Sequence, residues 1–252
     1  MLKNNKKKFN IQDNQYFFPY HYIPYFDLTD CPRRSQFLGW GLDYLCYLLH
    51  IREMIIEKRP QSLLDVGCGD GRFLNLLYGH VQNLTGCDLS KKAIDFAKAF
   101  NENINYLCLD AHLLDGEFDI VTAIEVLEHI PDEQIPSFIK TLCSKVRVGG
   151  NIVVCVPSTL IKIQEKHYRH YDENLLDSQM KIAGIGLKKT QCTRVIKHRD
   201  IIYQIYLRMT SNKFFQIEIP FLNKLIWKYL WNRRIHPFKG MHIIATYEKV
   251  SD

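Results

Sequence analysis

Short apolar runs alternate with segments of helical period through the central part of the chain. The apolar runs span residues 62–66, 83–87, 104–109, 118–124, 151–156, 187–196 and 241–248, and the amphipathic segments span 70–79, 90–101, 133–146 and 173–183. Strands that alternate with helices form a mainly parallel sheet with helices on both faces. The pattern therefore predicts an α/β protein with a doubly wound, Rossmann-like sheet.

The segment before the first strand has a different pattern. Apolar residues recur at helical spacing from Arg33 to about Lys58, which predicts one or two helices. Residues 16–26 are rich in aromatic side chains and interrupted by proline, so we expect them to cover part of the domain without forming a regular element. They either pack on the domain or form a lid whose tyrosines close a pocket.

A basic segment, residues 197–239, separates the last two predicted strands. It contains one apolar stripe at helical spacing, formed by Leu222, Leu225, Ile226, Tyr229 and Leu230. Trp227, Trp231 and several cations flank this stripe. The segment is either a lid helix that packs on the domain or an interfacial helix that contacts an anionic membrane as a peripheral protein does.

Composition and charge place further bounds on the chain. Its 252 residues, 46% of them hydrophobic, suit one domain with additions. The net charge of +6 arises in residues 1–10, with four lysines, and in residues 197–239, with nine Lys or Arg against two acids. The eight cysteines form no C-x-x-C pair and no apolar run approaches the roughly 20 residues of a membrane span. We therefore expect a cytoplasmic protein.

A glycine-rich turn follows the first predicted strand. It has the pattern Asp65-x-Gly67-x-Gly69-x-Gly71, with an acid before the glycines and the third glycine one residue earlier than in the G-x-G-x-x-G pattern of dinucleotide folds. Glycine allows both the sharp turn and the close approach of a ligand. These residues resemble motif I of class I S-adenosylmethionine-dependent methyltransferases of the small-molecule type.

The resemblance implies a fold and a set of cofactor-binding residues. The fold is a seven-stranded, mostly parallel sheet with an antiparallel last strand, and the cofactor is S-adenosyl-L-methionine, which leaves as S-adenosyl-L-homocysteine. The residues expected to bind it are Asp65, Gly67, Cys68, Gly69, Gly71, Asp88, Leu89, Asp110, Ala111 and Glu125. Asp88 ends the second strand, where its two carboxylate oxygens can accept from both ribose hydroxyls, and Asp110 would lie beside the adenine.

With this resemblance the chain divides into four parts. They are an N-terminal extension and lid (1–60), an S-adenosylmethionine-binding core (61–196), a helical basic insertion that lies over the acceptor side (197–239), and the last core strand with the C-terminus (240–252).

Methyl transfer from a sulfonium requires above all that the acceptor atom is held near the methyl carbon. A hydroxyl acceptor also needs a base, and His or carboxylate side chains at the carboxyl ends of the fourth and fifth strands are suitable. The catalytic candidates are His129, His170, Tyr171 and Glu125, and those for acceptor contact are Tyr20, Tyr22, His167 and Tyr168. His129 or His170 is the expected base, and no metal site is predicted.

The expected reaction is methyl transfer to a small-molecule hydroxyl, on a sugar or on a lipid-linked or glycan precursor, without a nucleic-acid partner. Two alternatives within the enzyme class remain. Glu125-x-x-Glu128-His129 with a downstream His resembles the metal-binding pattern of RNA 3′-terminal 2′-O-methyltransferases, and N-methylation of a small metabolite uses the same cofactor motifs. Outside this class, a non-catalytic binding protein is disfavoured by the intact acids, and an NAD-dependent oxidoreductase by the early third glycine.

Overall fold

The computed structural model describes residues 25–26, 32–33, 41–183, 186–210, 217 and 219–251. The chain divides into two units, Met1–Gly41 and Leu42–Asp252. In the first, β1 (Tyr25–Phe26) and β2 (Pro32–Arg33) form an antiparallel pair. The predicted acceptor residues Tyr20 and Tyr22 lie outside the described residues.

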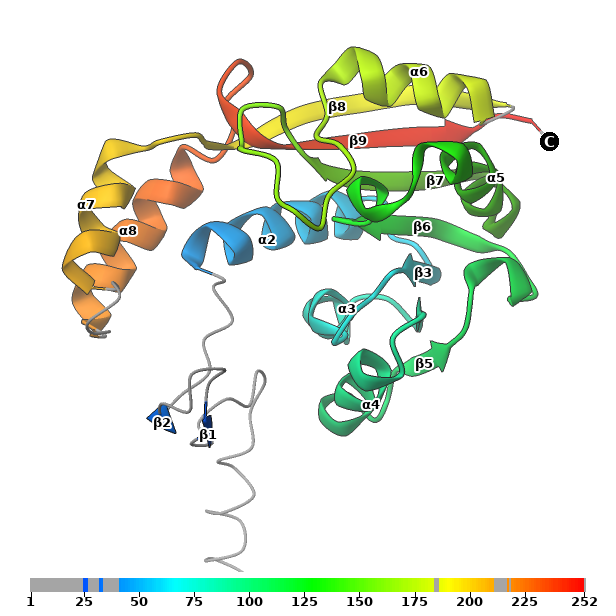
Figure 1. Ribbon diagram of the computed structural model, residues 1–252. Coiled ribbons are helices and arrows are strands. Elements are labelled where there is room, and N and C mark those ends of the chain that lie inside the picture. Colours follow the sequence, from blue (N-terminus) through cyan, green and yellow to red (C-terminus); the bar gives the residue numbers. More distant parts are fainter. Residues whose placement is uncertain are drawn as a thin grey trace, which may run out of the picture. The chain divides into compact units, whose positions relative to one another are not determined.

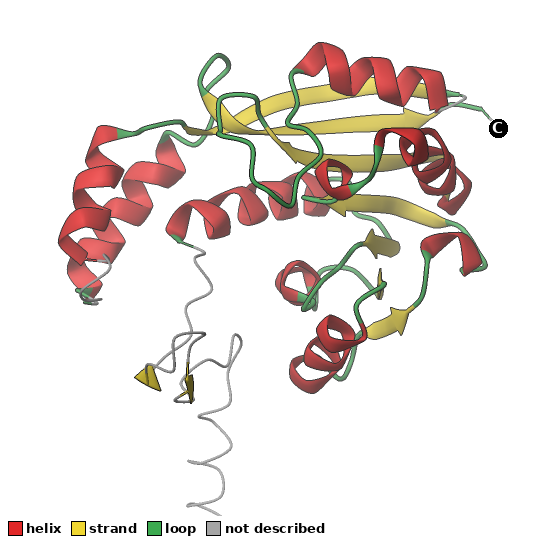
Figure 2. Ribbon diagram, viewed as in Figure 1, coloured by secondary structure: helices red, strands yellow, loops and turns green. Residues whose placement is uncertain are grey.

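A seven-stranded sheet forms the centre of the second unit (Figures 1 and 2). Its strands are β3 (Ser62–Val66), β4 (Asn83–Asp88), β5 (Asn105–Cys108), β6 (Phe118–Ile124), β7 (Val146–Pro157), β8 (Leu187–Lys197) and β9 (Gly240–Lys249). Their order is β5-β4-β3-β6-β7-β9-β8, and β9 runs antiparallel to both of its neighbours while the other pairs are parallel. This confirms the predicted doubly wound sheet with an antiparallel last strand.

Helices cover both faces of the sheet, because its central strands alternate their side chains between two apolar clusters. Leu63 lies in the cluster with α2, α3, α4, α7 and α8, and the adjacent Leu64 lies in the cluster with α5 and α6. The helices are α2 (Leu42–Glu57), α3 (Arg72–Leu77), α4 (Lys91–Phe100), α5 (Ile135–Lys145), α6 (Glu173–Ala183), α7 (Ile201–Thr210) and α8 (Pro220–Asn232). The sheet core is therefore closed on both sides.

Some element bounds differ from those predicted. The strand expected from residue 151 already begins at Val146, and the helix before it ends at Lys145. Gly149 and Gly150 lie inside this strand, where the pairing with β6 shifts register. Residues 1–60 were expected to form an N-terminal extension. Their last part, α2, belongs to the second unit, because the buried face of α2 packs on the sheet and on α8.

The described part of the insertion between β8 and β9 contains two helices, where one was predicted. α7 and α8 extend beyond the end of β8 (Figure 1). Tyr203 of α7 and Ile226 and Leu230 of α8 are buried in the cluster that contains α2. Among the described residues, no helix is long and apolar enough to cross a membrane.

Candidate active site

The glycine-rich turn connects β3 to α3 and places backbone at the carboxyl edge of the sheet. Gly67, Gly69 and Gly71 all have positive φ angles, of 75°, 54° and 75°. The N–H groups of Gly67 and Cys68 donate to the Cys87 carbonyl, at 2.8 and 3.1 Å. The turn is thus fixed to the next strand, in a backbone conformation that favours glycine.

Two carboxylates follow the neighbouring strands. Asp88 ends β4, where its Oδ2 accepts from the Gly69 N–H at 3.0 Å and its Oδ1 from the Ser90 N–H at 2.8 Å. Asp110 follows β5; burial alone would raise its pKa, but hydrogen bonds from the backbone and ring of His112 outweigh this and lower the pKa. Each oxygen of Asp88 has a second lone pair, and both bonds to Asp110 end on its Oδ1, so both acids can also accept from a ligand.

These acids line a cavity of about 560 Å³ at the carboxyl edge of the sheet. The predicted residues on its wall are Gly67, Asp88, Leu89, Asp110, Ala111, Glu125 and His129. Sequence reasoning missed the opposite wall, which the start of α5 and the turn before it supply through Gln134, Ser137, Phe138 and Thr141. Their spacing of three to four residues marks one helical face, and this was the signal that could have found them.

Asp65 and Cys68 lie beneath the turn and do not line this cavity. Asp65 is 3% exposed, its Oδ1 accepts from the Thr122 hydroxyl at 2.6 Å, and burial raises its pKa to about 7. The side chain of Cys68 packs against Gly86, leaving no room for a Cβ there. The contacts of Asp65 with Thr122 and of Cys68 with Gly86 stabilise the turn.

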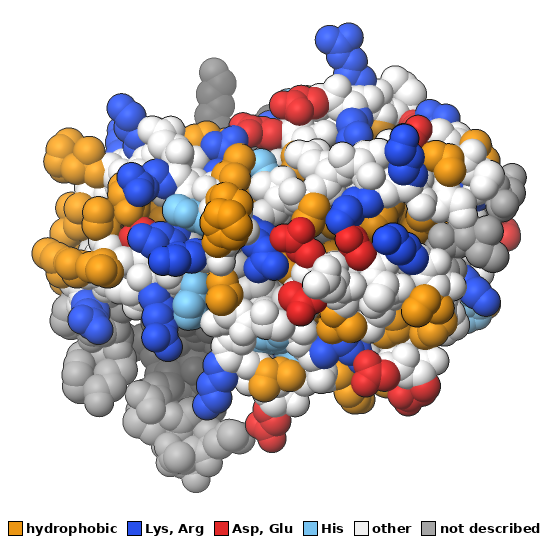
Figure 3. Space-filling model, turned by 90° about the horizontal axis from the view of Figure 1, so that it is seen from above, with side chains coloured by type: hydrophobic (Ala, Val, Ile, Leu, Met, Phe, Trp, Pro, Cys, Tyr) orange, Lys and Arg blue, Asp and Glu red, His pale blue; other side chains and the backbone are white. Residues whose placement is uncertain are grey.

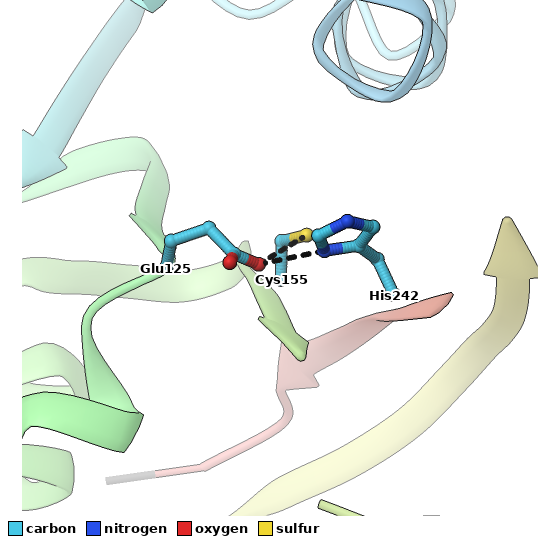
Figure 4. Close-up of side chains that lie close together, drawn as sticks. All are labelled: Glu125, Cys155 and His242. Carbon is cyan, nitrogen blue, oxygen red and sulfur yellow. Dashed lines mark hydrogen bonds and ion pairs between the residues drawn. The ribbon is translucent and has the colours of Figure 1, made fainter. Parts of the chain in front are cut away.

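Glu125 lies at the end of β6 in a strained conformation, with a φ of 56°. Its N–H donates to the Cys155 carbonyl at 2.8 Å, and its Oε1 accepts from His242 Nδ1 at 3.0 Å and from the Cys155 thiol at 3.5 Å (Figure 4). The ring of Tyr47 lies 4.3 Å from that of His242. Since His242 and Cys155 belong to β9 and β7, no local pattern in the sequence could have assigned them to Glu125.

Three histidines form a connected group beside Glu128. His129 Nδ1 lies 3.2 Å from the Lys166 carbonyl oxygen, and His170 Nδ1 lies 2.9 Å from that of Ile161. A carbonyl only accepts, so both Nδ1 atoms carry hydrogen. With one hydrogen on the His170 ring, its Nε2 accepts from His167 Nδ1, at 2.8 Å. This arrangement leaves the lone pairs on Nε2 of His129 and of His167.

Glu128 lies next to these lone pairs. It is fully buried, and neither carboxylate oxygen has a hydrogen-bond partner among the described residues. Burial, followed by the charge of Glu125, raises its pKa to about 9. Donor atoms of Glu128, His129 and His167 lie within 4.8 Å of one another, and burial with the neighbouring histidines lowers the pKa of His167 to about 4. One carboxylate and two imidazoles are a donor set for a divalent transition metal.

Two of the predicted catalytic residues are held by contacts of their own. Both ring nitrogens of His170 are engaged, so His170 orients His167 and offers no lone pair as a base. Tyr171 is 0% exposed, and its hydroxyl donates to Gln179 Oε1 at 3.2 Å or the Leu127 carbonyl at 3.4 Å. It stabilises the core and does not reach the cavity. Tyr168 is 60% exposed, and its N–H donates to the Glu128 carbonyl.

Comparison with known proteins identifies the family. A family model described as a methyltransferase domain matches residues 43–184. The chain belongs to this family. A structure of an S-adenosylmethionine-dependent methyltransferase from Archaeoglobus fulgidus matches this methyltransferase with a TM-score of 0.58 and 18% identity, covering 84% of the chain and 96% of the other. Fold and family therefore agree with the expectation from motif I.

Two curated relatives match part of this methyltransferase. A ubiquinone biosynthesis O-methyltransferase of Coxiella burnetii is 39% identical over 107 residues, which span 40% of the chain and 45% of the relative. A tRNA N(3)-methylcytidine methyltransferase of Schizosaccharomyces pombe is 35% identical over 143 residues, 52% of the chain and 58% of the relative. The matched segments thus span about half the length of these relatives.

The cavity of this methyltransferase fits S-adenosylmethionine. That molecule carries a sulfonium, an α-amino group, a ribose and an adenine, and no phosphate. The cavity offers carboxylates at Asp88, Asp110 and Glu125 and has no lysine or arginine on its described wall. Such a wall suits a cationic ligand with a diol and would oppose a pyrophosphate.

Proposed function

We propose that this methyltransferase transfers the methyl group of S-adenosylmethionine to a hydroxyl of a small-molecule acceptor, with His129 as the base. The observation that carries the proposal is the fixed tautomer of His129. Its Nδ1 hydrogen is held by the Lys166 carbonyl, and His129 lines the same cavity as Asp88 and Asp110. Its Nε2 lone pair is therefore the one that could accept the acceptor's proton.

The other residues of the cavity would bind the cofactor and orient it. Asp88 would accept from the ribose hydroxyls while the backbone of Gly69 and Ser90 holds its carboxylate, and Asp110 would lie at the adenine. Glu125, fixed by His242, would lie toward the cofactor. The bound cofactor supplies an electrophilic methyl group, and the chain contributes position, exclusion of water and removal of the acceptor proton.

The opposite wall of the cavity supports an acceptor with both apolar and polar parts. Ile130 and Phe138 provide apolar surface, and Gln134, Ser137 and Thr141 provide hydrogen-bonding groups beside it. Such a wall suits a ring with hydroxyl substituents, as in a sugar or in a lipid-linked precursor, and the named O-methyltransferase relative is consistent with a small hydroxylated acceptor.

The first test is binding of S-adenosylhomocysteine and of NAD by isothermal titration calorimetry. We expect binding of the first and none of the second; the opposite result would refute the cofactor assignment. With an acceptor found by screening hydroxylated compounds, His129→Ala should lower kcat at least about tenfold without weakening S-adenosylhomocysteine binding. His80→Ala is the control, because His80 is exposed and precedes β4 at the other edge of the sheet. Full activity of His129→Ala would refute the base assignment.

A second candidate is a metal-dependent methyl transfer, and it is favoured by the buried carboxyl of Glu128, which has no hydrogen-bond partner among the described residues. Glu128, His129 and His167 would hold a divalent ion, which would lower the pKa of a bound hydroxyl. This candidate includes the 2′-hydroxyl of RNA as an acceptor. Metal analysis of the purified protein tests it: a bound ion that is lost in Glu128→Gln, together with activity lost on chelation, would replace the metal-free proposal. Activity untouched by chelator would exclude this candidate.

A further inference from the structure

The helix α7 is apolar on two opposite faces. Its inner face includes Tyr203, which is 4% exposed and packs in the sheet-side core. Its outer face carries Ile201, Ile202, Ile205 and Met209, which are 71%, 49%, 50% and 60% exposed. Helical geometry places these four side chains within an arc of about 100°. A helix that is buried on one face and apolar on the other has an unoccupied contact surface.

The apolar surface continues at the end of the helix pair. The Ile217 N–H donates to the Thr210 carbonyl at 2.7 Å, so Ile217 lies beside the last turn of α7. Ile217, Ile219 and Phe221 are between 43% and 73% exposed. Figure 3 shows hydrophobic side chains gathered over the α7–α8 end of the molecule, with Lys and Arg side chains beside them. We call these exposed residues of 201–221 the apolar end.

The sequence around the apolar end is basic, with one acid, Glu218, between Ile217 and Ile219. Residues 197–239 hold nine Lys or Arg and two acids. One of the acids, Asp200, is 6% exposed and accepts from the Tyr229 hydroxyl, so it contributes little to the surface. Lys224 and Lys228 are exposed on the outer face of α8, one turn apart and beside Leu225. The surface is thus complementary to a partner that is both apolar and anionic.

We propose that the apolar end docks on the surface of an anionic lipid membrane. Exposed isoleucines, with methionine and phenylalanine, can enter the acyl boundary while lysines contact the headgroups. A second copy of the chain would bring two basic surfaces together, and like charges oppose that pairing. Nucleic acid binds through basic and aromatic groups on which bases stack, whereas this surface is mainly aliphatic. An anionic membrane is the partner that would contact both the apolar side chains and the lysines.

The structure changes which residues carry this contact. The sequence pattern pointed to Trp227 and Trp231, but these rings stack on each other at 5.6 Å and are only half-exposed. The Arg234 guanidinium lies 3.9 Å from the centre of the Trp231 ring. The tryptophans therefore stabilise the insertion, and the outer face of α7 is the anchor.

The anchor and the cavity lie at the same edge of the sheet. β8 is parallel to β7, because both run antiparallel to β9, so α7 leaves from the carboxyl edge at which the cavity opens. Docking would place this edge near the lipid surface. The inference on docking is independent of the proposed methyl transfer, and its test does not use activity.

The experiment is co-sedimentation of the full chain with vesicles of phosphatidylcholine alone and of phosphatidylcholine mixed with phosphatidylglycerol. We expect binding to the anionic vesicles only, weakened at least about tenfold when salt shortens the Debye length from about 10 Å to about 4 Å. The variant Ile205→Asp/Met209→Asp should weaken binding at least about tenfold. Lys224→Gln/Lys228→Gln should weaken it and reduce its salt dependence.

The matched control is Val148→Asp/Ile182→Asp, which adds the same charge at exposed apolar positions elsewhere, 46% and 77% exposed. It should bind as the wild type does. Unfolding in urea shows that each variant is folded before its binding is compared. No binding of wild type to anionic vesicles at low salt would overturn the proposal, as would equal losses in the test and control variants. Dimers that Ile205→Asp/Met209→Asp dissociates, or preferential binding to single-stranded RNA, would assign the surface to those partners.

Discussion

Gly67→Ala is the most informative substitution in the cofactor turn, because two separate costs meet at this residue. Its φ of 75° costs an alanine about 1–2 kcal/mol. A Cβ there would also lie 2.6 Å from a methyl carbon of Val126, a contact closer than side chains tolerate. Overpacking of this kind costs about 1–3 kcal/mol, so the free energy of unfolding should fall by about 2–5 kcal/mol in total.

The chain offers a control for each cost. Gly69→Ala meets nothing within 4 Å of its Cβ and has a φ of 54°, so it should lose only the backbone part, about 1–2 kcal/mol. Val126→Ala removes both methyl carbons that clash and leaves the backbone of Gly67 unchanged. In a double-mutant cycle, Gly67→Ala should therefore cost about 1–3 kcal/mol less in the Val126→Ala background.

Urea unfolding followed by circular dichroism measures these free energies, and calorimetry with S-adenosylhomocysteine measures affinity. Since Gly67 and Val126 both line the cavity, the clash should weaken ligand binding as well, and Val126→Ala should restore part of it. Two results would refute this reasoning: equal losses of unfolding free energy in the Gly67 and Gly69 variants, or a double-mutant cycle with no coupling energy. Either would show that contact with Val126 is not the reason why position 67 requires glycine.

Three further predictions concern single side chains. Asp88→Asn should weaken S-adenosylhomocysteine binding about 10- to 100-fold by calorimetry, because an amide offers one acceptor oxygen where the carboxylate offers two; unchanged affinity would contradict the ribose assignment. Burial, then the Arg234 charge, lowers the pKa of His50 to about 4, so folded His50 binds fewer protons than unfolded His50 between pH 4 and 6.5. The free energy of unfolding should fall by up to about 3 kcal/mol as pH falls through that window, and His50→Phe should remove this dependence in urea titrations. His242→Ala should weaken S-adenosylhomocysteine binding about tenfold by calorimetry, because Glu125 loses the group that fixes it toward the cofactor, and His242→Gln, which retains a donor, should recover part of the loss; equal affinity in all three proteins would exclude a positioning role.

Local patterns predicted the elements of this fold because each depends on neighbours in the sequence. The alternation of apolar runs and helical stripes located the sheet strands to within a few residues, except the start of β7 at Val146. The turn between β3 and α3 was predicted equally well, since positive φ angles and close side-chain neighbours both favour glycine at positions 67 and 71.

The site was predictable only in part. Asp88 and Asp110 follow strands, so topology brought them to one edge as expected. The roles of His170 and Tyr171 depended on which groups surround them, and the cluster H-Y-R-H-Y carries no sign that one histidine orients another while the tyrosine is buried. The partner of Glu125 was beyond local reasoning, since His242 lies 117 residues away on the antiparallel strand β9.

That antiparallel strand gives the insertion a physical connection to the site. Ile226 and Leu230 of α8 are buried in the same cluster as α2, and Tyr47 of α2 stacks on His242. His242 in turn donates to Glu125, whose left-handed backbone persists only while its surroundings hold it. β9 begins directly after the insertion. The start of this strand therefore both follows the α7–α8 pair and carries His242, which donates to the Glu125 carboxylate. Packing of the insertion and orientation of Glu125 are therefore parts of one contiguous set of contacts.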